Sequence, residues 1–333
     1  MVQTKWLPDF MKEELPPDVK GKVFVITGTT SGTGYVAAKI AAQLGGEVVM
    51  LNRESSRVQT MLSQLKSEVP DGKFVTVACD LQDFESVRKA AKEVKSKYSM
   101  IYCLANNAGI MAAEDKATTD GYDIQMQTNH LSHFLLTAEL YPLLEASANE
   151  TGDARIVNHS SGGRKRTPNN GLEEKYFQKN GGNLGGDEVE GFLKGPRFER
   201  YFQTKLANAV FNYGLHKKLE AKGSKVRAIC CDPGASATNL ANGLSFGFFT
   251  DMFVSVLLPF LAQSGEDGAM GLLKGMMGPD AKSGVHYGPQ GNKDKGYTGR
   301  PLPTPLYPYE MDSDSLNMLW KTSEEATGVS FDV

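Results

Sequence analysis

The sequence predicts an α/β fold, a doubly wound parallel sheet formed by a single domain. Strand patterns alternate with helical periodicities between residues 20 and 235, and several of the strands are apolar without interruption. Such strands are typical of a parallel sheet that helices cover on both faces. A glycine-rich turn also follows the first strand. We therefore expect ligands to bind at the carboxyl ends of the strands.

The predicted elements follow one another along the chain with short connections. Strands are expected at 22–28, 46–51, 73–79, 101–106, 154–160 and 225–231, and helices near 33–44, 55–68, 83–97, 120–148 and 200–222. No internal repeat or low-complexity linker divides the 333 residues. The expected organisation is an N-terminal extension, one domain, and a C-terminal helix or tail: 1–20, 21–310 and 311–333.

The composition is typical of a compact globular enzyme. Hydrophobic residues make up 40% and charged residues 23%, and the net charge of −3 leaves no basic surface for nucleic acid. The cysteines lie in apolar runs without metal-ligand spacing, so we expect reduced thiols and no metal: Cys79, Cys103, Cys230 and Cys231. The first residues, Met1 to Asp9, do not have the apolar core expected of a secretion signal, and no apolar stretch of about 20 residues occurs in the sequence. We expect a cytoplasmic or peripherally membrane-associated monomer or homodimer that is not secreted.

The most informative segment runs from Val23 to Gly34, where an apolar strand passes directly into three glycines. Gly28 permits a tight turn, Gly32 leaves room for a pyrophosphate, and Gly34 lets the next helix lie close to the sheet. The alternative is a surface turn without a ligand, but the flanking strand and helix favour dinucleotide binding in a Rossmann-type fold. The other residues of the turn are expected to contact the cofactor as well: Thr30, Ser31 and Thr33.

The residues that follow the second strand indicate NADP(H) rather than NAD(H). An NAD(H) site usually has an acidic residue there for the ribose hydroxyls, whereas this chain has Asn52 and Arg53. A guanidinium group suits a 2'-phosphate, although Arg53 could also be an ordinary solvated charge. After the third strand, Asp80 and Leu81 are placed to contact the adenine, unless Asp80 only caps the following helix.

Catalytic candidates are sought at the ends of the fourth and fifth strands. We interpret Asn106 and Asn107 as braces between loops, while Ser160 or Ser161 would present a hydroxyl to the nicotinamide. A tyrosine with a lysine four residues later would place an acid/base pair on one helix face. The spacing occurs at Tyr35/Lys39, Tyr201/Lys205 and Tyr213/Lys217. Tyr201/Lys205 alone begins the helix before the last core strand, so we select that pair.

Together these motifs resemble the short-chain dehydrogenase/reductase family over roughly residues 20 to 240. The matching residues occur in family order: Thr27, Gly28, Gly32, Gly34, Asp80, Asn106–Asn107–Ala108–Gly109, Asn129, Ser161, Tyr201, Lys205, Pro233 and Gly234. Residues 119–125 and 129–137 are similar to the retinol dehydrogenase and protochlorophyllide reductase branch. The resemblance implies an NADP(H)-dependent oxidoreductase that interconverts a carbonyl and an alcohol.

The resemblance also implies roles for individual residues. Tyr201 would be the acid/base, and the ammonium group of Lys205 would favour its phenolate and hold the nicotinamide ribose. Ser161 would hydrogen-bond the substrate oxygen, with Ser160 as the neighbouring candidate, and Asn129 would hold a water that connects Lys205 to solvent. Further cofactor contacts are implied at Asn107, Ala108, Gly109, Pro233, Gly234 and Thr238.

Two segments are expected to influence substrate choice. Residues 162–200 form an insertion between Ser161 and Tyr201, which we interpret as either a disordered surface loop or a specificity lid. Residues 240–263 are rich in aromatic and aliphatic side chains. They suit a roof over a bulky apolar aldehyde, ketone or alcohol, or shallow membrane contact; a buried packing helix is the alternative.

A different class of function remains open at this stage. The chain could be an NADP(H)-binding regulatory or scaffold protein without turnover, because a fold alone does not establish catalysis. The presence of Asn129, Ser161, Tyr201 and Lys205 together argues for an enzyme.

Overall fold

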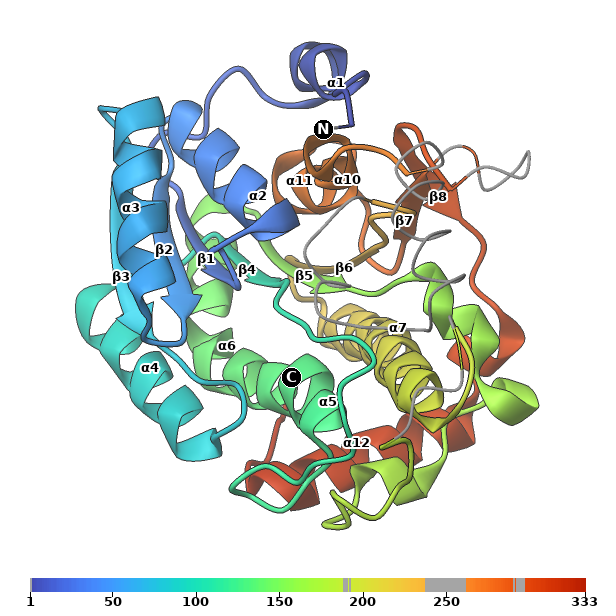
Figure 1. Cartoon of the computed structure of the whole chain (residues 1–333). Coiled ribbons are helices and arrows are strands. Elements are labelled where there is room, and N and C mark those ends of the chain that lie inside the picture. The colour runs from blue at the N-terminus through green and yellow to red at the C-terminus, as the bar shows by residue number, and fades with distance from the viewer. Residues whose placement is uncertain (1, 188–190, 192, 237–261, 290, 292–296) are drawn as a thin grey trace.

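The computed structural model describes residues 2–187, 191, 193–236, 262–289, 291 and 297–333. Within that part of the chain, one sheet contains eight strands in the order β3-β2-β1-β4-β5-β6-β7-β8 (Figure 1). The first six are parallel neighbours and confirm the predicted strands: β1 (Val23–Thr27), β2 (Glu47–Asn52), β3 (Lys73–Ala78), β4 (Cys103–Asn106), β5 (Ala154–His159) and β6 (Val226–Cys231). The predicted doubly wound sheet is therefore confirmed.

Helices cover both faces of the sheet. One face carries α2 (Gly32–Gln43), α3 (Ser56–Glu68), α10 (Gly265–Gly268) and α11 (Met270–Met277). The other carries α4 (Phe84–Lys97), α6 (Ser132–Thr151), α7 (Pro196–Lys222) and α12 (Ser313–Thr327). Apolar side chains fill both interfaces, and strand positions alternate between them: Val25 and Val49 pack on the second layer, Phe24 and Val48 on the first.

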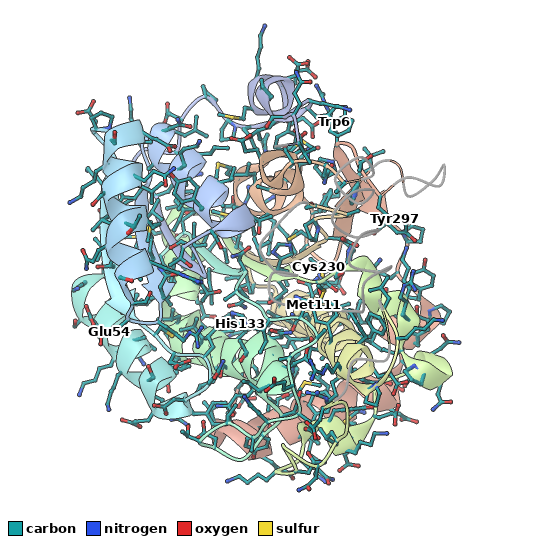
Figure 2. The ribbon with its side chains drawn as sticks, viewed as in Figure 1. Trp6, Glu54, Met111, His133, Cys230 and Tyr297 are labelled. Atoms are coloured by element: carbon teal, nitrogen blue, oxygen red, sulfur yellow. The ribbon has the colours of Figure 1, made fainter. Side chains whose placement is uncertain are left out.

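The ends of the chain pack on this framework. The N-terminal helix α1 (Leu7–Glu14) contacts α11 and buries Phe10. Figure 2 shows His133 and Cys230 in the interior, where both are buried, whereas Glu54 and Tyr297 are exposed. All four cysteines are buried and free, as expected from their apolar surroundings. No helix in the described ranges is long and apolar enough to span a bilayer.

Two helices differ from their predicted bounds. The helix predicted near 120–148 begins as α5 (Ile124–Met126), passes through a π-helical turn at Gln127–Leu131, and continues as α6. The helix predicted from residue 200 starts earlier, at Pro196, because proline suits the first position of a helix. Tyr201 therefore lies in the second turn of α7 rather than at its beginning.

The sheet extends beyond the last predicted strand. β7 (His286–Pro289) runs parallel to β6, and β8 (Pro301–Thr304) runs antiparallel to β7 at the edge. The sequence pattern did not predict either strand. Together they widen the sheet on the side where β6 ends in Asp232, Pro233 and Gly234.

The described part of the predicted insertion is packed against the domain. It contains three short 3-10 turns, η2 (Gly162–Arg166), η3 (Pro168–Asn170) and η4 (Glu174–Phe177). Tyr176 and Phe177 are buried in the core cluster that also includes α12. Of the predicted substrate-covering segment 240–263, only residues 262 and 263 belong to the described part of the chain.

Candidate functional site

The glycine turn has the geometry that its sequence predicts. Gly28 and Gly32 have φ angles of +71° and +60°, a region that favours glycine. A Cβ on Gly34 would lie 2.3 Å from the carbonyl oxygen of Gly28, so a larger residue there would push α2 away from the turn. Ser31 precedes α2 without capping it through its side chain. The first amides of α2 are thus free to face an anion.

Asn107 braces this turn from the end of β4. Its Nδ2 donates to the carbonyl oxygens of Thr27 and Gly28, at 2.9 and 3.2 Å. Its Oδ1 accepts from the Thr33 hydroxyl at 2.9 Å. In return, Thr27 Oγ1 accepts from the amides of Asn107 and Ala108, at 3.0 and 2.9 Å. The predicted bracing role of Asn107 is therefore observed.

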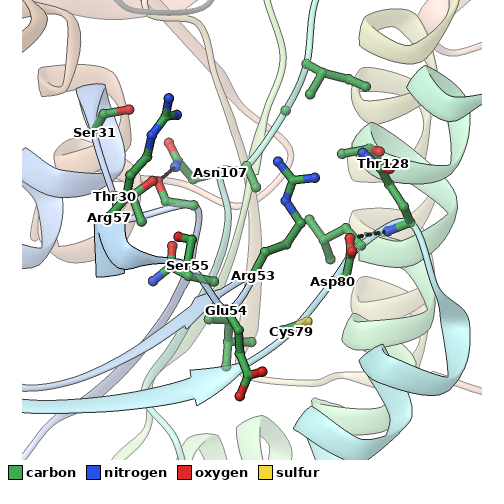
Figure 3. Close-up of a pocket in the computed structure, with 18 of the residues that line it drawn as sticks. Thr30, Ser31, Arg53, Glu54, Ser55, Arg57, Cys79, Asp80, Asn107 and Thr128 are labelled. Atoms are coloured by element: carbon green, nitrogen blue, oxygen red, sulfur yellow. Dashed lines mark hydrogen bonds between the residues drawn. The ribbon is translucent and has the colours of Figure 1, made fainter. Parts of the chain in front are cut away.

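A pocket of about 940 Å³ opens beside the turn, at the carboxyl ends of β1, β2 and β3 (Figure 3). Many residues predicted to contact a dinucleotide line it: Gly28, Thr30, Ser31, Gly32, Thr33, Asn52, Arg53, Asp80, Leu81, Asn107, Ala108 and Gly109. Gly34 is not part of the lining and acts through close packing. Thr238 lies outside the described residues. The pocket's length along three strand ends suits an extended nucleotide.

The pocket contains a basic residue that the sequence argument missed. Arg57, at the start of α3, lines the pocket with Arg53, and both guanidinium groups extend over it in Figure 3. Both side chains are exposed, and neither forms a salt bridge with another described residue. Glu54 also lines the pocket. The sequence did contain a signal for Arg57. It follows Arg53 by four residues, and α3 starts between them, so the first turn of that helix lies close to the end of β2.

Asp80 lies at the end of β3 on the opposite wall. Its Oδ1 accepts from the amide of Gln82 at 3.0 Å, and its own amide donates to Ser86 Oγ at 2.9 Å. The N-cap of α4 is Asp83, which accepts from the amide of Glu85. Asp80 therefore shapes the turn before the helix, and the alternative that it caps α4 is wrong.

The two serines after β5 point in different directions. Ser160 is buried, and its hydroxyl donates to the carbonyl oxygen of Lys205 at 2.7 Å. Ser161 accepts from the amide of Gly163 at 3.2 Å and is hydrogen-bonded to Tyr201. Ser161 is therefore the serine that meets Tyr201, whereas Ser160 holds the backbone of α7.

Lys205 lies between Tyr201 and the nucleotide pocket. Its Nζ donates to the carbonyl oxygen of His159 at 3.1 Å and lies 5.7 Å from the centroid of the Tyr201 ring. A Cβ on Gly109 would be 3.5 Å from that Nζ and 3.2 Å from Oδ1 of Asn129. Because Gly109 also lines the pocket, it connects the pocket to these two side chains.

Asn129 occupies the π-helical turn and anchors the loop after β4. Its Oδ1 accepts from the amide of Ile110 at 2.8 Å, and its Nδ2 donates to the Ile110 carbonyl and to Thr204 Oγ1, each at 2.9 Å. π-helical turns are rare and frequently occur at functional sites. Here the turn brings Asn129 to both the Gly109–Ile110 loop and α7.

Burial dominates the protonation of Tyr201 and Lys205. It raises the pKa of Tyr201 to about 12, against the hydrogen bond from Ser161, which lowers it. It lowers the pKa of Lys205 to about 8. We expected the ammonium group of Lys205 to lower the pKa of Tyr201; in this structure burial outweighs any such effect, and Tyr201 is a protonated donor at neutral pH.

The other two tyrosine–lysine pairs lie away from Ser161. The Tyr35 hydroxyl donates to Glu68 Oε1 at 2.9 Å, and Lys39 pairs with the same carboxylate at 3.1 Å, on the outside of α2 and α3. Lys217 is exposed and pairs with Glu220. Among the three candidates, the structure thus brings only Tyr201 to Ser161.

The turn after β6 closes the site from the other side. Gly234 has a φ of +65°, and a Cβ there would lie 2.1 Å from the carbonyl oxygen of Tyr297. Its amide donates to Asp232 Oδ1 at 2.8 Å. Asp232 is buried, and a Cβ on Gly162 would lie 3.7 Å from its Oδ2, while a Cβ on the next residue, Gly163, would lie 3.4 Å from the Tyr201 ring.

Comparison with known proteins agrees with this arrangement. The family model described as short chain dehydrogenase matches residues 22–171. An uncharacterized oxidoreductase of Schizosaccharomyces pombe is 38% identical, over 67% of this chain and 63% of its own length. Human polyprenol dehydrogenase is 30% identical, over 84% of this chain and 79% of the relative.

A solved structure has the same fold over its whole length. A protein of Mycobacterium paratuberculosis is 27% identical with a TM-score of 0.72, and the match covers 100% of both chains. More distant structures of this fold include complexes with NADH and with NADP. The matched glycine turn, the sheet order and the relatives lead to one conclusion: the chain belongs to the short-chain dehydrogenase/reductase family of oxidoreductases.

Proposed function

We propose that the protein is an NADP(H)-dependent oxidoreductase that interconverts a carbonyl and an alcohol on a bulky apolar substrate. One observation carries the proposal. Ser161, Tyr201 and Lys205 gather beyond the carboxyl end of β5, and Gly109 joins Lys205 to the nucleotide pocket. A hydroxyl donor, an acid and an ammonium group thus lie beside the place where a nicotinamide would extend from that pocket.

The side chains divide the proton chemistry among them. NADPH, when bound, supplies the hydride. Tyr201, which a pKa of about 12 keeps protonated at neutral pH, gives its hydroxyl proton to the carbonyl oxygen, because the alkoxide that develops there is a stronger base than the phenolate. Ser161 donates a hydrogen bond to the same oxygen as negative charge develops there. Lys205 holds the nicotinamide ribose, and Asn129 maintains the path from Lys205 to solvent. The alkoxide that forms on the substrate thus takes its proton from Tyr201, and no hydronium ion from solvent is needed.

The preference for NADP(H) rests on the wall beside β2. Arg53 and Arg57 line the pocket with two guanidinium groups beyond the end of β2, where the adenosine ribose of a bound dinucleotide would lie. Guanidinium groups bind phosphate through paired hydrogen bonds, whereas an NAD(H) site usually carries an acid for the ribose hydroxyls. Glu54 opposes a phosphate, but the two positive charges outnumber it.

The proposed substrate class rests on a relative and on an apolar segment. Human polyprenol dehydrogenase, by its name, acts on a long isoprenoid alcohol. A chain of that kind needs an apolar covering, which residues 240–263 would supply. Most of that segment lies outside the described residues, so its role stays a prediction. The likeness to the retinol dehydrogenase branch also stays a prediction.

The test is a carbonyl reductase assay with matched tyrosine variants. NADPH oxidation is followed with a panel of aldehydes from propanal to farnesal and retinal. Tyr201→Phe removes the transferable proton and should lower kcat by about 1000-fold or more while NADPH still binds. Tyr213→Phe is the control and should keep kcat.

Two results would contradict this proposal. Equal losses in the two tyrosine variants would mean that Tyr201 is not the acid. Tight NADPH binding without turnover of any aldehyde or of the matching alcohols would favour a regulatory or scaffold protein.

A further inference from the structure

A buried arginine connects the candidate site to the C-terminal part of the chain. Arg164 lies in η2, three residues after Ser161, and its side chain is fully buried. Its Nε is 2.7 Å from Glu310 Oε1, and its Nη1 is 3.4 Å from Asp232 Oδ2. Glu310 ends the 3-10 turn η7 (Pro308–Glu310) and accepts from the amide of Tyr307 at 2.8 Å. One guanidinium group therefore joins η2, the end of β6 and η7.

Arg164 is also connected to the two turns that flank the proposed reaction centre. Nη1 of Arg164 also donates to the carbonyl oxygen of Ser161 at 3.4 Å. The second oxygen of Asp232, Oδ1, accepts from the amide of Gly234 at 2.8 Å. The side chain of Arg164 thus holds the backbone of Ser161 directly and the Pro233–Gly234 turn through Asp232.

The turn η2 is also pressed against α7. A Cβ on Gly163 would lie 3.4 Å from the Tyr201 ring and 2.9 Å from the Phe202 ring. Gly163 in turn donates its amide to Ser161 Oγ at 3.2 Å. A shift of Arg164 would therefore move Ser161 relative to Tyr201.

Stability alone is a poor explanation for this arrangement. Taking three charged groups out of water is expensive, and replacing buried ion pairs with apolar residues is often neutral or stabilising. Nη2 of Arg164 is buried without a hydrogen-bond partner among the described residues, which adds a further cost. The neighbouring ring of His286 is buried as well, and its pKa is lowered well below the usual value by burial and by the charges of Arg164 and Lys165.

We propose that Arg164 is a positioning residue, which with Asp232 and Glu310 holds Ser161 and the Pro233–Gly234 turn in place against Tyr201. The inference rests on the proposed function, since it assigns Ser161 and Tyr201 to the reacting carbonyl. Its consequence is that the η7 turn, far along the chain, contributes to the rate of the chemical step. The nucleotide pocket, which Arg164 does not line, should be unaffected.

The experiment compares Arg164→Lys with Arg155→Lys. Arg155 is an equally buried arginine near the amino end of β5, where it contacts Asp153 and the carbonyl oxygens of Gly275 and Gly278. Both variants keep a positive charge but lose the forked geometry. For each protein we would measure Tm, NADPH affinity by fluorescence, and kcat for farnesal. The primary deuterium isotope effect with 4-deuterated NADPH and the amide exchange of residues 161–164 and 232–235 complete the set.

Arg164→Lys should lower kcat by about 10- to 100-fold, because small displacements of reacting groups have effects of that size. NADPH affinity should stay within about 2-fold, the isotope effect should rise, and exchange in both segments should become faster. Arg155→Lys should have a lower Tm but an unchanged kcat. Equal kcat and isotope effects in the two folded variants would overturn the proposal.

Two further measurements decide the proposal if the first variant does not fold or the unmodified protein shows no activity. If Arg164→Lys does not fold, Glu310→Gln takes its place, because it retains an acceptor oxygen while losing the charge; unchanged kcat in that variant would overturn the proposal. If the unmodified protein reduces no aldehyde, the proposed function fails. Faster exchange in Arg164→Lys would then still support the positioning of the two turns, since that readout needs no turnover.

Discussion

Asn52 and Thr29 hold each other through two hydrogen bonds. Oδ1 of Asn52 accepts from the Thr29 amide, and Nδ2 of Asn52 donates to Thr29 Oγ1, each at 2.8 Å. Both residues are buried, and the pair closes the glycine turn onto the end of β2. Each polar atom of the Asn52 amide already has a partner, and the cationic groups that line the pocket beside it are the guanidinium groups of Arg53 and Arg57.

This pair leads to a prediction about cofactor choice. An Asn52→Asp variant keeps the acceptor for the Thr29 amide, and its second oxygen can accept from the Thr29 hydroxyl where Nδ2 now donates to it, but the variant adds a negative charge beside the proposed 2'-phosphate site. We expect NADPH to bind about 10-fold more weakly, with NADH affinity nearly unchanged. Fluorescence titration of both cofactors measures the ratio. A parallel loss for the two cofactors would show that the residue acts only on the turn.

The two arginines should separate NADPH from NADH. A charge-assisted hydrogen bond contributes about 1.5–3 kcal/mol, so Arg53→Ala and Arg57→Ala should each weaken NADPH binding by about 10-fold or more. NADH binding should change by less than about 2-fold. Lys66→Ala is the matched control, because it removes the same charge from the exposed far end of α3. Equal NADPH and NADH affinities in the unmodified protein would refute the NADP(H) assignment.

Because of Lys205, the free energy of unfolding should change with pH in the alkaline range. Burial lowers its pKa from 10.5 to about 8, so between these values the unfolded chain binds a proton that the folded chain lacks. The free energy of unfolding from this group therefore rises with pH across that window and falls as pH decreases through it. The effect is at most about 1.4 kcal/mol for each pH unit.

Urea unfolding at pH 7, 8, 9 and 10 tests the effect against Lys205→Met. Relative to that variant, the unmodified protein should gain stability between pH 8 and 10. Tyr201 works in the opposite direction above pH 10, since its pKa is raised to about 12, so the comparison stops there. A stability difference that does not change with pH would mean that Lys205 titrates near its ordinary value.

The two serines should give contrasting variants. Ser161→Ala removes the proposed donor to the substrate oxygen and should lower kcat by about 100-fold with Tm nearly unchanged. Ser160→Ala removes the buried hydroxyl that donates to the Lys205 carbonyl and should lower the free energy of unfolding by about 1–3 kcal/mol. Its effect on kcat should be smaller than that of Ser161→Ala. Thermal unfolding and steady-state kinetics on both proteins are sufficient. The reverse pattern would assign the chemistry to Ser160.

The sequence predicted the part of the fold that has strong local patterns. β1 to β6 are bounded by turns, and several of them are apolar runs. Gly28 and Gly32 have positive φ angles, and Gly34 packs too closely against the turn to carry a side chain. β7 and β8 were missed because His286–Pro289 and Pro301–Thr304 contain glycine and proline and show no apolar alternation. β7 becomes a strand because β6 offers it an edge, and β8 then pairs with β7.

The missed side chains have a different cause. Arg57 lies on α3, whose sequence has the pattern of a surface helix. It lines the pocket because the helix begins close to the end of β2. Arg164 meets Glu310 across 146 positions of sequence, a distance at which no local pattern gives information. The regular spacing of Tyr201 and Lys205 made this pair a candidate in the sequence, whereas the raised pKa of Tyr201 depends on its burial in the assembled fold.

The composition of β8 also limits how two copies of this chain can associate. A sheet grows when its edge strand offers amide hydrogens and carbonyl oxygens to a further strand. Pro301 and Pro303 are two of the four residues of β8, and neither has an amide hydrogen. Continuous antiparallel growth of the sheet past β8 is therefore discouraged, which leaves β3, at the opposite end of the strand order, as the edge with a full set of amide hydrogens.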